Sequence, residues 1–426
     1  MKKLPYGISD YEKIIKDNYY YVDKTMNIEK LENLSEPYIM FLRPRKFGKT
    51  LFTSTLEHYY DINQKDEFET LFSQTYIGKN PTNFSGIDTS SGNATISGFK
   101  ARTMSAIKVF CEKYKLDFYI NENDEAENIL DNLFKAFYIQ KASERLYVII
   151  DEYDHFSNEL LGFDTEKFKD LVSKNGKIRK WYEVLKQGTE SVVDRIFITG
   201  VAPITLDSLT SGFNISTDIT QDEQFNEMLG FTKKELIVLM NEQDISKEKQ
   251  ELLLPLLKEN YDGYIFSMYG NESVYNSNMC LFLLSQYIRL KRIPEDLVDS
   301  NIASDYSKLG GMLDICEGDN KMQILERTIS GEGILTEITR KFNPEIGFGE
   351  KEFASMLFYL GYLTIRGNLI GKAKLQIPNL IIRKLYLSYF MELVNNKANL
   401  KIDPNDYNEI IEQIERYGEF EDIKNI

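Results

Sequence analysis

A Gly-Lys-Thr tripeptide at residues 48–50 offers the clearest chemistry in this chain. An apolar run at 38–42 precedes it and predicts a buried strand, and helical spacing follows at 51–57. Strand, short loop, Gly-Lys-Thr and helix is the layout of a phosphate-binding loop, whose N–H groups point at phosphate oxygens. In such a loop Lys49 reaches the β and γ phosphates and the Thr50 hydroxyl ligates Mg²⁺. We therefore expect phosphate contacts from Arg45, Lys46, Phe47, Gly48, Lys49, Thr50 and Leu51.

Arg43 occupies the position where the common form of this motif has its first glycine. A side chain there must fit the opening turn of the loop, so the loop either has another shape or uses Arg43 for a function. We treat Arg43 as a candidate catalytic residue that holds the γ-phosphate from the loop mouth. A Gly-Lys-Thr at a helix start also arises by coincidence, because the tripeptide alone is common. A second feature is therefore needed to distinguish a nucleotide site from coincidence.

That second feature lies downstream, where the apolar run at 146–150 ends in Asp151 and Glu152. In P-loop enzymes an Asp at such a strand end holds the Mg²⁺ shell, and a following Glu can orient and deprotonate the attacking water. An apolar strand that simply runs into a solvated turn gives the same pattern by itself. Together with the upstream loop, the pattern predicts nucleotide binding, with Thr50 and Asp151 as metal ligands and Glu152 as the base.

Several different short motifs are spread through most of the chain, among them Arg-Pro-Arg-Lys-Phe-Gly-Lys-Thr (43–50), Ile-Asp-Glu-Tyr-Asp (150–154) and Tyr-Asp-Gly-Tyr (261–264). Others lie at 4–11, 21–25, 198–201, 274–276 and 360–364. In combination they resemble the predicted AAA-ATPase-like proteins of bacteria, which are often fused to a C-terminal nuclease of the PD-(D/E)XK type. The resemblance implies that Arg43 is a family trait and that ATP is the ligand; no guanine-reading Asn-Lys-x-Asp motif occurs.

The resemblance also implies roles for residues outside the loop. In the AAA-like arrangement a polar residue at the end of a later strand positions the attacking water, so Thr199, which ends the apolar run 192–199, is our candidate sensor of the γ-phosphate. A Thr-Gly that merely ends a strand is the alternative. By similar analogy residues 21–25 either touch the base or form a covering strand and helix cap. No strand carrying Asp followed by Glu-x-Lys occurs in the last thirty residues, so we expect the fused nuclease to be absent.

Composition restricts the classes of function. The 426 residues suffice for two or three domains, and a net charge of −15 disfavours broad electrostatic binding to nucleic acid. Three scattered cysteines and two histidines fit no metal-ligand spacing, and so sparse and odd a set of cysteines favours a reducing compartment. The first residues lack the apolar core of a signal peptide, and no run approaches the roughly 20 apolar residues of a membrane span. We predict a cytoplasmic protein that has no membrane partner.

The elements that position these residues are expected in four segments. Residues 1–220 are predicted to form the AAA-like ATPase core and 221–304 a helical lid. Residues 305–395 are predicted to form a winged-helix-like domain with two short strands around a Gly-rich turn, and 396–426 a C-terminal helical tail. These boundaries follow shifts in the periodicity of apolar residues.

Three local expectations bear on the fold. The stretch 80–98 is rich in Ser, Thr, Asn and Gly and has no convincing apolar strand where the family has one. A lost central strand would be costly in a parallel sheet, so we expect reduced activity. Helices are predicted across 165–187 and near 321–341.

We predict an α/β P-loop NTPase with a parallel sheet and helices on both faces, followed by the helical lid and the winged-helix-like module. The expected reaction is Mg²⁺-dependent hydrolysis of ATP. One alternative is a switch or interaction module that binds ATP and barely hydrolyses it. The missing strand favours this alternative, and so does the lack of a histidine in the winged-helix region, where many STAND proteins use one to hold ADP.

Another alternative is the regulatory half of a nuclease system, which would need a partner. A protein partner or a homo-oligomer is compatible with either reading. DNA contact through the wing, whose turn carries Arg366, Lys372 and Lys374, is the less favoured interpretation because such modules more often pack on the ATPase core.

Overall fold

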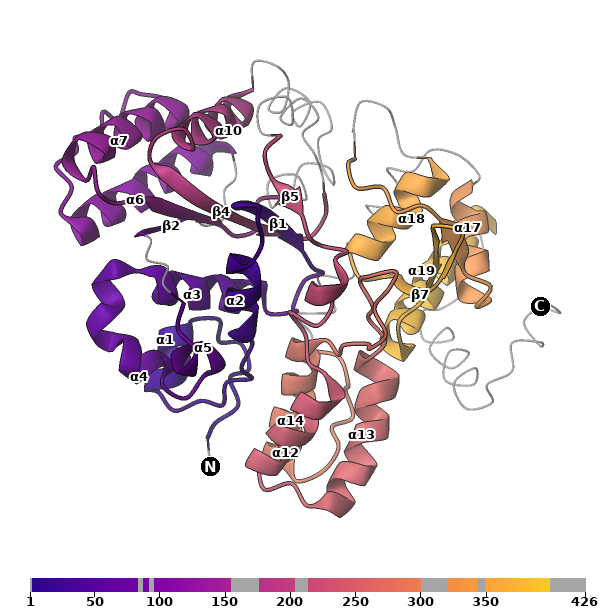
Figure 1. The fold of residues 1–426 in the computed structure, drawn as a ribbon. Coiled ribbons are helices and arrows are strands. Elements are labelled where there is room, and N and C mark those ends of the chain that lie inside the picture. Colours follow the sequence, from indigo (N-terminus) through magenta and orange to yellow (C-terminus); the bar gives the residue numbers. More distant parts are fainter. Residues whose placement is uncertain are drawn as a thin grey trace.

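The computed structural model describes residues 2–82, 87–91, 96–154, 176–203, 214–299, 320–342 and 349–398. The architecture is mixed α/β: a parallel sheet in the first half of the chain, helices after it, and a small antiparallel sheet toward the C-terminus (Figure 1). Within these ranges, every helix is too short or too polar to cross a membrane.

The parallel sheet has the strand order β2-β3-β4-β1-β5, and every pairing in it is parallel. Its strands are β1 (Tyr38–Leu42), β2 (Ile87–Ser91), β3 (Leu146–Ile150), β4 (Val193–Gly200) and β5 (Thr217–Asp218). All five residues of β3 are buried, as expected for a parallel strand covered on both faces. Because parallel strands end at one edge of a sheet, the residues that follow β1, β3 and β4 lie on the same side.

Strand β2 corrects the expectation that a strand is missing within residues 80–98. Its residues pair with β3 in continuous register, from Ile87 opposite Leu146 to Ser91 opposite Ile150. The polar composition concealed this strand, since strand pairing is made by backbone groups and a strand at the end of a sheet needs only one neighbour. The sheet therefore continues beyond β3, and the missing strand no longer argues against activity.

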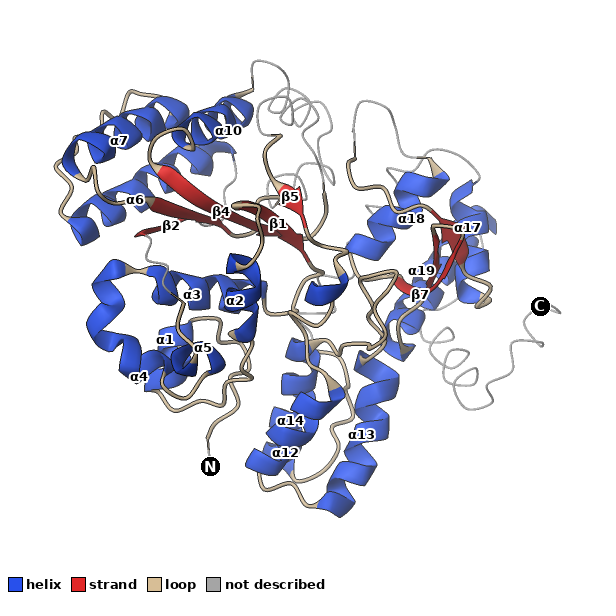
Figure 2. Cartoon of the chain, in the orientation of Figure 1, coloured by secondary structure: helices blue, strands red, loops and turns tan. Residues whose placement is uncertain are grey.

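Helices cover both faces of the parallel sheet (Figure 2). One layer holds α1 (Tyr11–Lys16), α2 (Met26–Glu32), α3 (Lys49–Tyr60), a 3₁₀ helix (Ile62–Glu67), α4 (Phe68–Phe72) and α5 (Tyr76–Lys79). The other layer holds α6 (Ile96–Tyr114), α7 (Ala126–Gln140) and α10 (Lys177–Gly188). One apolar cluster joins the sheet to both layers. Helix α10 accounts for the end of the helical region predicted at 165–187, whose first part lies outside the described residues.

The chain after β5 passes through a 3₁₀ turn (Glu223–Phe225) into what we call the three-helix unit, residues 233–290. The unit consists of α12 (Lys233–Glu242), α13 (Lys247–Tyr261) and α14 (Ser277–Leu290). The buried apolar side chains of its helices form a core cluster of their own, whereas Tyr264, Phe266 and Val274, between α13 and α14, belong to the cluster of the parallel sheet. Figure 1 shows the unit projecting below the sheet, beside the layer that contains α3.

The C-terminal part contains a three-stranded antiparallel sheet in the order β6-β8-β7, packed with helices. The elements are α17 (Asn320–Ile329), β6 (Ile334–Thr336), α18 (Glu350–Tyr359), β7 (Thr364–Leu369), β8 (Lys372–Gln376) and α19 (Leu380–Ala398). The helix predicted near 321–341 is therefore wrong in its second half. Gly331 and Gly333 have φ values of +81° and +78°, which end the helix and lead into β6. The predicted tail, 396–426, lies almost wholly outside the described residues.

Candidate functional site

The Gly-Lys-Thr loop connects β1 to α3 at the edge where the parallel strands end. Lys46 and Gly48 have φ values of +68° and +95°, so the loop turns twice through the left-handed region before the helix begins at Lys49. Gly48 suits that conformation because it has no Cβ, and its carbonyl accepts the N–H of Phe52, 3.0 Å away. The first N–H groups of α3 consequently face the space above the loop.

Lys49 lies inside this loop and is only 6% exposed. Its ammonium donates to the carbonyl oxygens of Arg43 and Pro44, at 2.8 and 2.9 Å. Burial lowers the pKa of Lys49, while the carboxylates of Asp154 and Asp151 act in the opposite direction. The lysine is therefore a buried cation held at the loop by neutral acceptors.

Asp151 follows β3 directly. Burial raises its pKa, and a hydrogen bond from the Thr50 side chain to its carboxylate acts against that effect. Its Oδ1 atom is buried and has no hydrogen-bond partner among the described residues. An unpartnered buried carboxylate oxygen next to a hydroxyl is a donor set that suits a hard divalent cation. The two predicted metal ligands, Thr50 and Asp151, are thus brought together.

Glu152 takes a different position from its neighbour. It lines the cavity above the loop, whereas Asp151 does not. Its φ of +51° is uncommon for a residue with a Cβ, and such conformations cluster at functional sites. The left-handed turn sends the two adjacent carboxylates to separate places.

Asp154 is a residue that the sequence analysis did not assign. It is 1% exposed, and its carboxylate accepts the N–H groups of Val201 and Ala202 at distances down to 3.0 and 2.8 Å. Burial raises its pKa, although these two backbone donors act against that effect. Asp154 therefore fixes the turn after β3 to the end of β4. The available signal in the sequence was a third carboxylate, Asp154, in the motif at 150–154.

Thr199 stands near the end of β4, next to Gly200, and is 1% exposed. Its carbonyl accepts the N–H of Tyr153 at 3.0 Å, and among the described residues its hydroxyl oxygen has no hydrogen-bond partner. It does not line the cavity. The structure places it beneath the acidic turn, with an uncommitted hydroxyl.

Arg43 points away from the loop mouth. It is 1% exposed, and its guanidinium donates to three backbone carbonyls, those of Leu42 (2.8 Å), Thr220 (2.9 Å) and Phe225 (2.7 Å). It also lies 4.1 Å from the centroid of the Phe266 ring, a cation–π distance. Burial lowers the pKa of Arg43 to about 9. This geometry differs from the expected contact between Arg43 and the γ-phosphate, because the guanidinium already binds three carbonyls and packs on the Phe266 ring.

A cavity of about 440 Å³ opens above the loop. The residues predicted to hold phosphate all line it, namely Arg45, Lys46, Phe47, Gly48, Lys49, Thr50 and Leu51. Its other charged lining residues are Lys24 and Glu152, so four cationic side chains face one carboxylate. In a chain of net charge −15, this concentration of positive charge favours an anionic ligand.

Two further walls enclose the cavity. One comes from the N-terminal segment and includes Pro5, Gly7, Ile8, Ser9, Tyr20, Tyr21, Val22 and Lys24. The other comes from the three-helix unit and the residues before it, and includes Leu229, Gly230, Phe231, Leu239, Ser277, Asn278 and Leu281. The N–H of Asn278 donates to the carbonyl of Lys46 at 3.3 Å, which ties α14 to the loop. Of these walls, only residues 21–25 were predicted to contact the ligand; Pro5, Gly7, Ile8 and Ser9 lie in the motif at 4–11, whose residue types do not by themselves indicate a contact.

Comparison with known proteins finds similarity to one protein family over part of the chain. A family model described as predicted AAA-ATPase matches residues 5–210. A protein from Azotobacter chroococcum mcd 1, described as an uncharacterized protein in the vnfD 5' region, is 26% identical over 405 residues, which cover 90% of this chain and 68% of that relative. The matched segment carries the Gly-Lys-Thr loop, Asp151, Glu152 and Thr199, so the part of the chain that holds the candidate site is similar to the predicted AAA-ATPases.

Proposed function

We propose that this protein binds ATP in the cavity above the Gly-Lys-Thr loop and hydrolyses it with Mg²⁺. The observation that carries the proposal is the charge of the cavity, where Arg45, Lys46 and Lys49 line the loop side together with Glu152; Lys24 also lines the cavity, but its ammonium is paired with Glu235. A triphosphate offers the matching negative charge, and the start of α3 offers N–H donors for it. The family of residues 5–210 supports the same ligand.

Each polar group of the loop has a role in this proposal. Lys49 exchanges its carbonyl acceptors for phosphate oxygens and anchors the β and γ phosphates. Thr50 and Asp151 hold Mg²⁺, which neutralises charge on the phosphate oxygens. Among the described residues no group of three or more His, Cys, Asp or Glu side chains could hold a metal ion. A Mg²⁺ site completed by phosphate needs only one or two protein oxygens, so the Thr50–Asp151 pair is sufficient.

Two groups are assigned to the attacking water. Glu152, at the cavity wall, accepts the proton of the water as general base. Thr199, with its uncommitted hydroxyl, orients the water or reports the γ-phosphate. We assign Arg43 a supporting role beneath the loop in place of a phosphate contact, because its three carbonyl partners hold it there.

We also propose a division of the chain into four segments around this site. Residues 1–220 form the ATPase core and 221–304, which include the three-helix unit, a lid whose apolar side chains close on the base. Residues 305–395 form a winged-helix-like module, supported by the order helix, strand, helix and β-hairpin, and 396–426 a tail. We further propose a cytoplasmic location, since Cys111 and Cys280 are both free and buried. A protein partner or a second copy of this chain is the proposed partner besides ATP.

The test is the substitution Lys49→Ala, measured as Mg²⁺-ATP affinity by titration calorimetry. Charge-assisted hydrogen bonds contribute about 1.5–3 kcal/mol each, so affinity is expected to fall tenfold or more. Lys65→Ala, on an exposed 3₁₀ helix, is the matched control and leaves affinity unchanged. Equal affinity for Lys49→Ala and wild type, with both proteins folded, would remove the proposal.

The second candidate function is a switch that binds ATP and barely hydrolyses it. The observation that favours it is the lack of a histidine in residues 305–395, where many STAND proteins use one to hold ADP. The pairing of β2 with β3 removes its other support. Phosphate release by purified protein, measured over many turnovers with and without DNA, separates the two. Binding without release favours the switch.

A further inference from the structure

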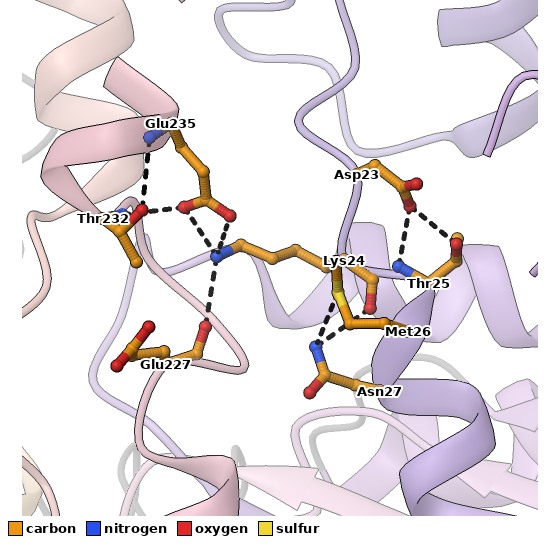
Figure 3. A network of polar contacts seen from close by, with 8 residues as sticks. All are labelled: Asp23, Lys24, Thr25, Met26, Asn27, Glu227, Thr232 and Glu235. Atoms are coloured by element: carbon orange, nitrogen blue, oxygen red, sulfur yellow. Dashed lines mark hydrogen bonds and ion pairs between the residues drawn. The ribbon is translucent and has the colours of Figure 1, made fainter. Parts of the chain in front are cut away.

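Lys24, which lines the cavity, joins the N-terminal segment to the three-helix unit (Figure 3). Its Nζ atom lies 2.7 Å from Oε1 and 2.8 Å from Oε2 of Glu235, the third residue of α12. It also donates to the carbonyl of Glu227 at 3.1 Å. The two side chains are only 10% and 24% exposed, so solvent screens this ion pair less than a surface pair.

The core side of the contact is fixed by neighbouring residues. Asp23 accepts hydrogen bonds from the N–H and hydroxyl of Thr25, at 2.8 and 2.6 Å, and from the N–H of Tyr76 at 2.6 Å. Asn27 donates to the carbonyl of Lys24 at 2.9 Å. Lys24 is thereby bound to α2 through Asn27, and its neighbour Asp23 to α5 through Tyr76. Figure 3 shows the Lys24 side chain extending from this segment to Glu235.

The other side of the contact is equally organised. Glu235 forms a capping box with Thr232: its carboxylate accepts the Thr232 N–H at 2.7 Å, and its own N–H donates to the Thr232 hydroxyl at 3.2 Å. The carboxylate therefore has a fixed rotamer at the first turn of α12, where the helix dipole favours negative charge. Leu239, one turn further along the same helix face, is part of the cavity wall.

We propose that the Lys24–Glu235 pair holds the three-helix unit against the N-terminal segment and so keeps the cavity closed over its ligand. Lys24 is then a positioning residue, which acts through Glu235 and not by touching the nucleotide. This inference rests on the proposed function for its nucleotide readout. Its structural readout, the local stability of α12, needs no nucleotide.

The experiment uses three variants of the full chain: Lys24→Met, Glu235→Gln and the double variant. Lys24→Met keeps the length of the side chain and removes the ammonium. Glu235→Gln removes the charge but leaves an amide oxygen for the Thr232 N–H, so the capping box is retained. Lys30→Met is the matched control, because Lys30 is exposed and also bridges to the segment before α12, through the Gln224 carbonyl at 3.1 Å.

Dissociation of a fluorescent ATP analogue is followed by stopped flow. Each single variant is expected to release it about tenfold faster than wild type, as loss of roughly 1.4 kcal/mol predicts. The double variant is expected to be no faster than either single variant, since both changes remove one interaction. Lys30→Met stays within about twofold of wild type.

Hydrogen exchange of the α12 amides, measured without nucleotide, gives the second readout. Faster exchange in Lys24→Met and Glu235→Gln, but not in Lys30→Met, supports the proposal. Faster analogue release in Lys24→Met alone overturns it, because Lys24 would then bind the nucleotide directly. Should wild type bind no analogue, the proposed function fails, and the exchange result alone decides the role of the pair; unchanged exchange overturns it.

Discussion

Replacing Arg43 by glycine restores the common form of the loop motif, yet we expect it to destabilise the protein. The guanidinium links three carbonyls from separate parts of the chain, those of Leu42, Thr220 and Phe225. Hydrogen bonds to a charged donor contribute about 1.5–3 kcal/mol each, and removing the side chain leaves these buried acceptors without a donor. The desolvation cost of the buried cation is relieved at the same time, which offsets part of the loss.

The net effect of Arg43→Gly is therefore an unfolding free energy lower by about 3–5 kcal/mol, including a smaller contribution from the flexibility of glycine. For a domain of this size that corresponds to a fall in Tm on the order of 10 °C. Differential scanning calorimetry measures it. Arg45→Gly is the matched control, because Arg45 is a half-buried neighbour that lines the cavity.

The two variants should separate stability from binding. Arg45→Gly is expected to shift Tm by no more than about 2 °C while weakening ATP several-fold, since it removes one cation facing the phosphates. Arg43→Gly is expected to lower Tm and, well below its Tm, to retain most ATP affinity. An unchanged Tm for Arg43→Gly combined with lost turnover would refute the reasoning and place the guanidinium at the γ-phosphate.

Two further predictions concern the acidic turn. Glu152→Gln should bind ATP normally and lose about 10²–10⁴ in turnover, measured as phosphate release. Asp151→Asn should weaken ATP binding, measured by calorimetry, only when Mg²⁺ is present. Wild-type turnover of Glu152→Gln would show that another group is the base. Gly200→Ala should lower the unfolding free energy by about 1–3 kcal/mol, because its Cβ would lie 2.5 Å from an oxygen of buried Asp154. Gly367→Ala, where a Cβ meets nothing within 4 Å, should be neutral in the same urea titration.

The parts of the site that could be predicted from the sequence are those with a local signal. The strand predicted at 38–42 is β1, and the apolar run at 146–150 is β3. Each signal is a short apolar run that ends in polar residues, and both strands are buried by helices on either face. Strand β2 lacked such a signal, because its pairing with β3 depends on backbone groups that every sequence has.

The contacts that organise the cavity could not be predicted, because their partners are distant in sequence. Lys24 meets Glu235, and Arg43 meets Phe225, without any pattern in one sequence that connects them. The charge of Lys24 did not predict its partner, since a lysine near a loop is usually solvated. The position of Arg43 in the motif predicts a place at the loop mouth, whereas its burial directs the guanidinium to backbone carbonyls beneath the loop.

The motif Arg-Pro-Arg-Lys-Phe-Gly-Lys-Thr makes sense once its two sides are considered together. Arg45 and Lys49 line the cavity, whereas Arg43 lies underneath and contacts the ring of Phe266, 4.1 Å away. Gly361, in the motif at 360–364, approaches the loop from the C-terminal part of the chain. A Cβ atom at this position would lie 2.8 Å from Pro44. The opening turn of the loop is thus packed between the parallel sheet and the segment that joins α18 to β7. A glycine at position 43 would leave that space empty, so the arginine replaces the flexibility of the common motif with a buried support that spans both halves of the chain.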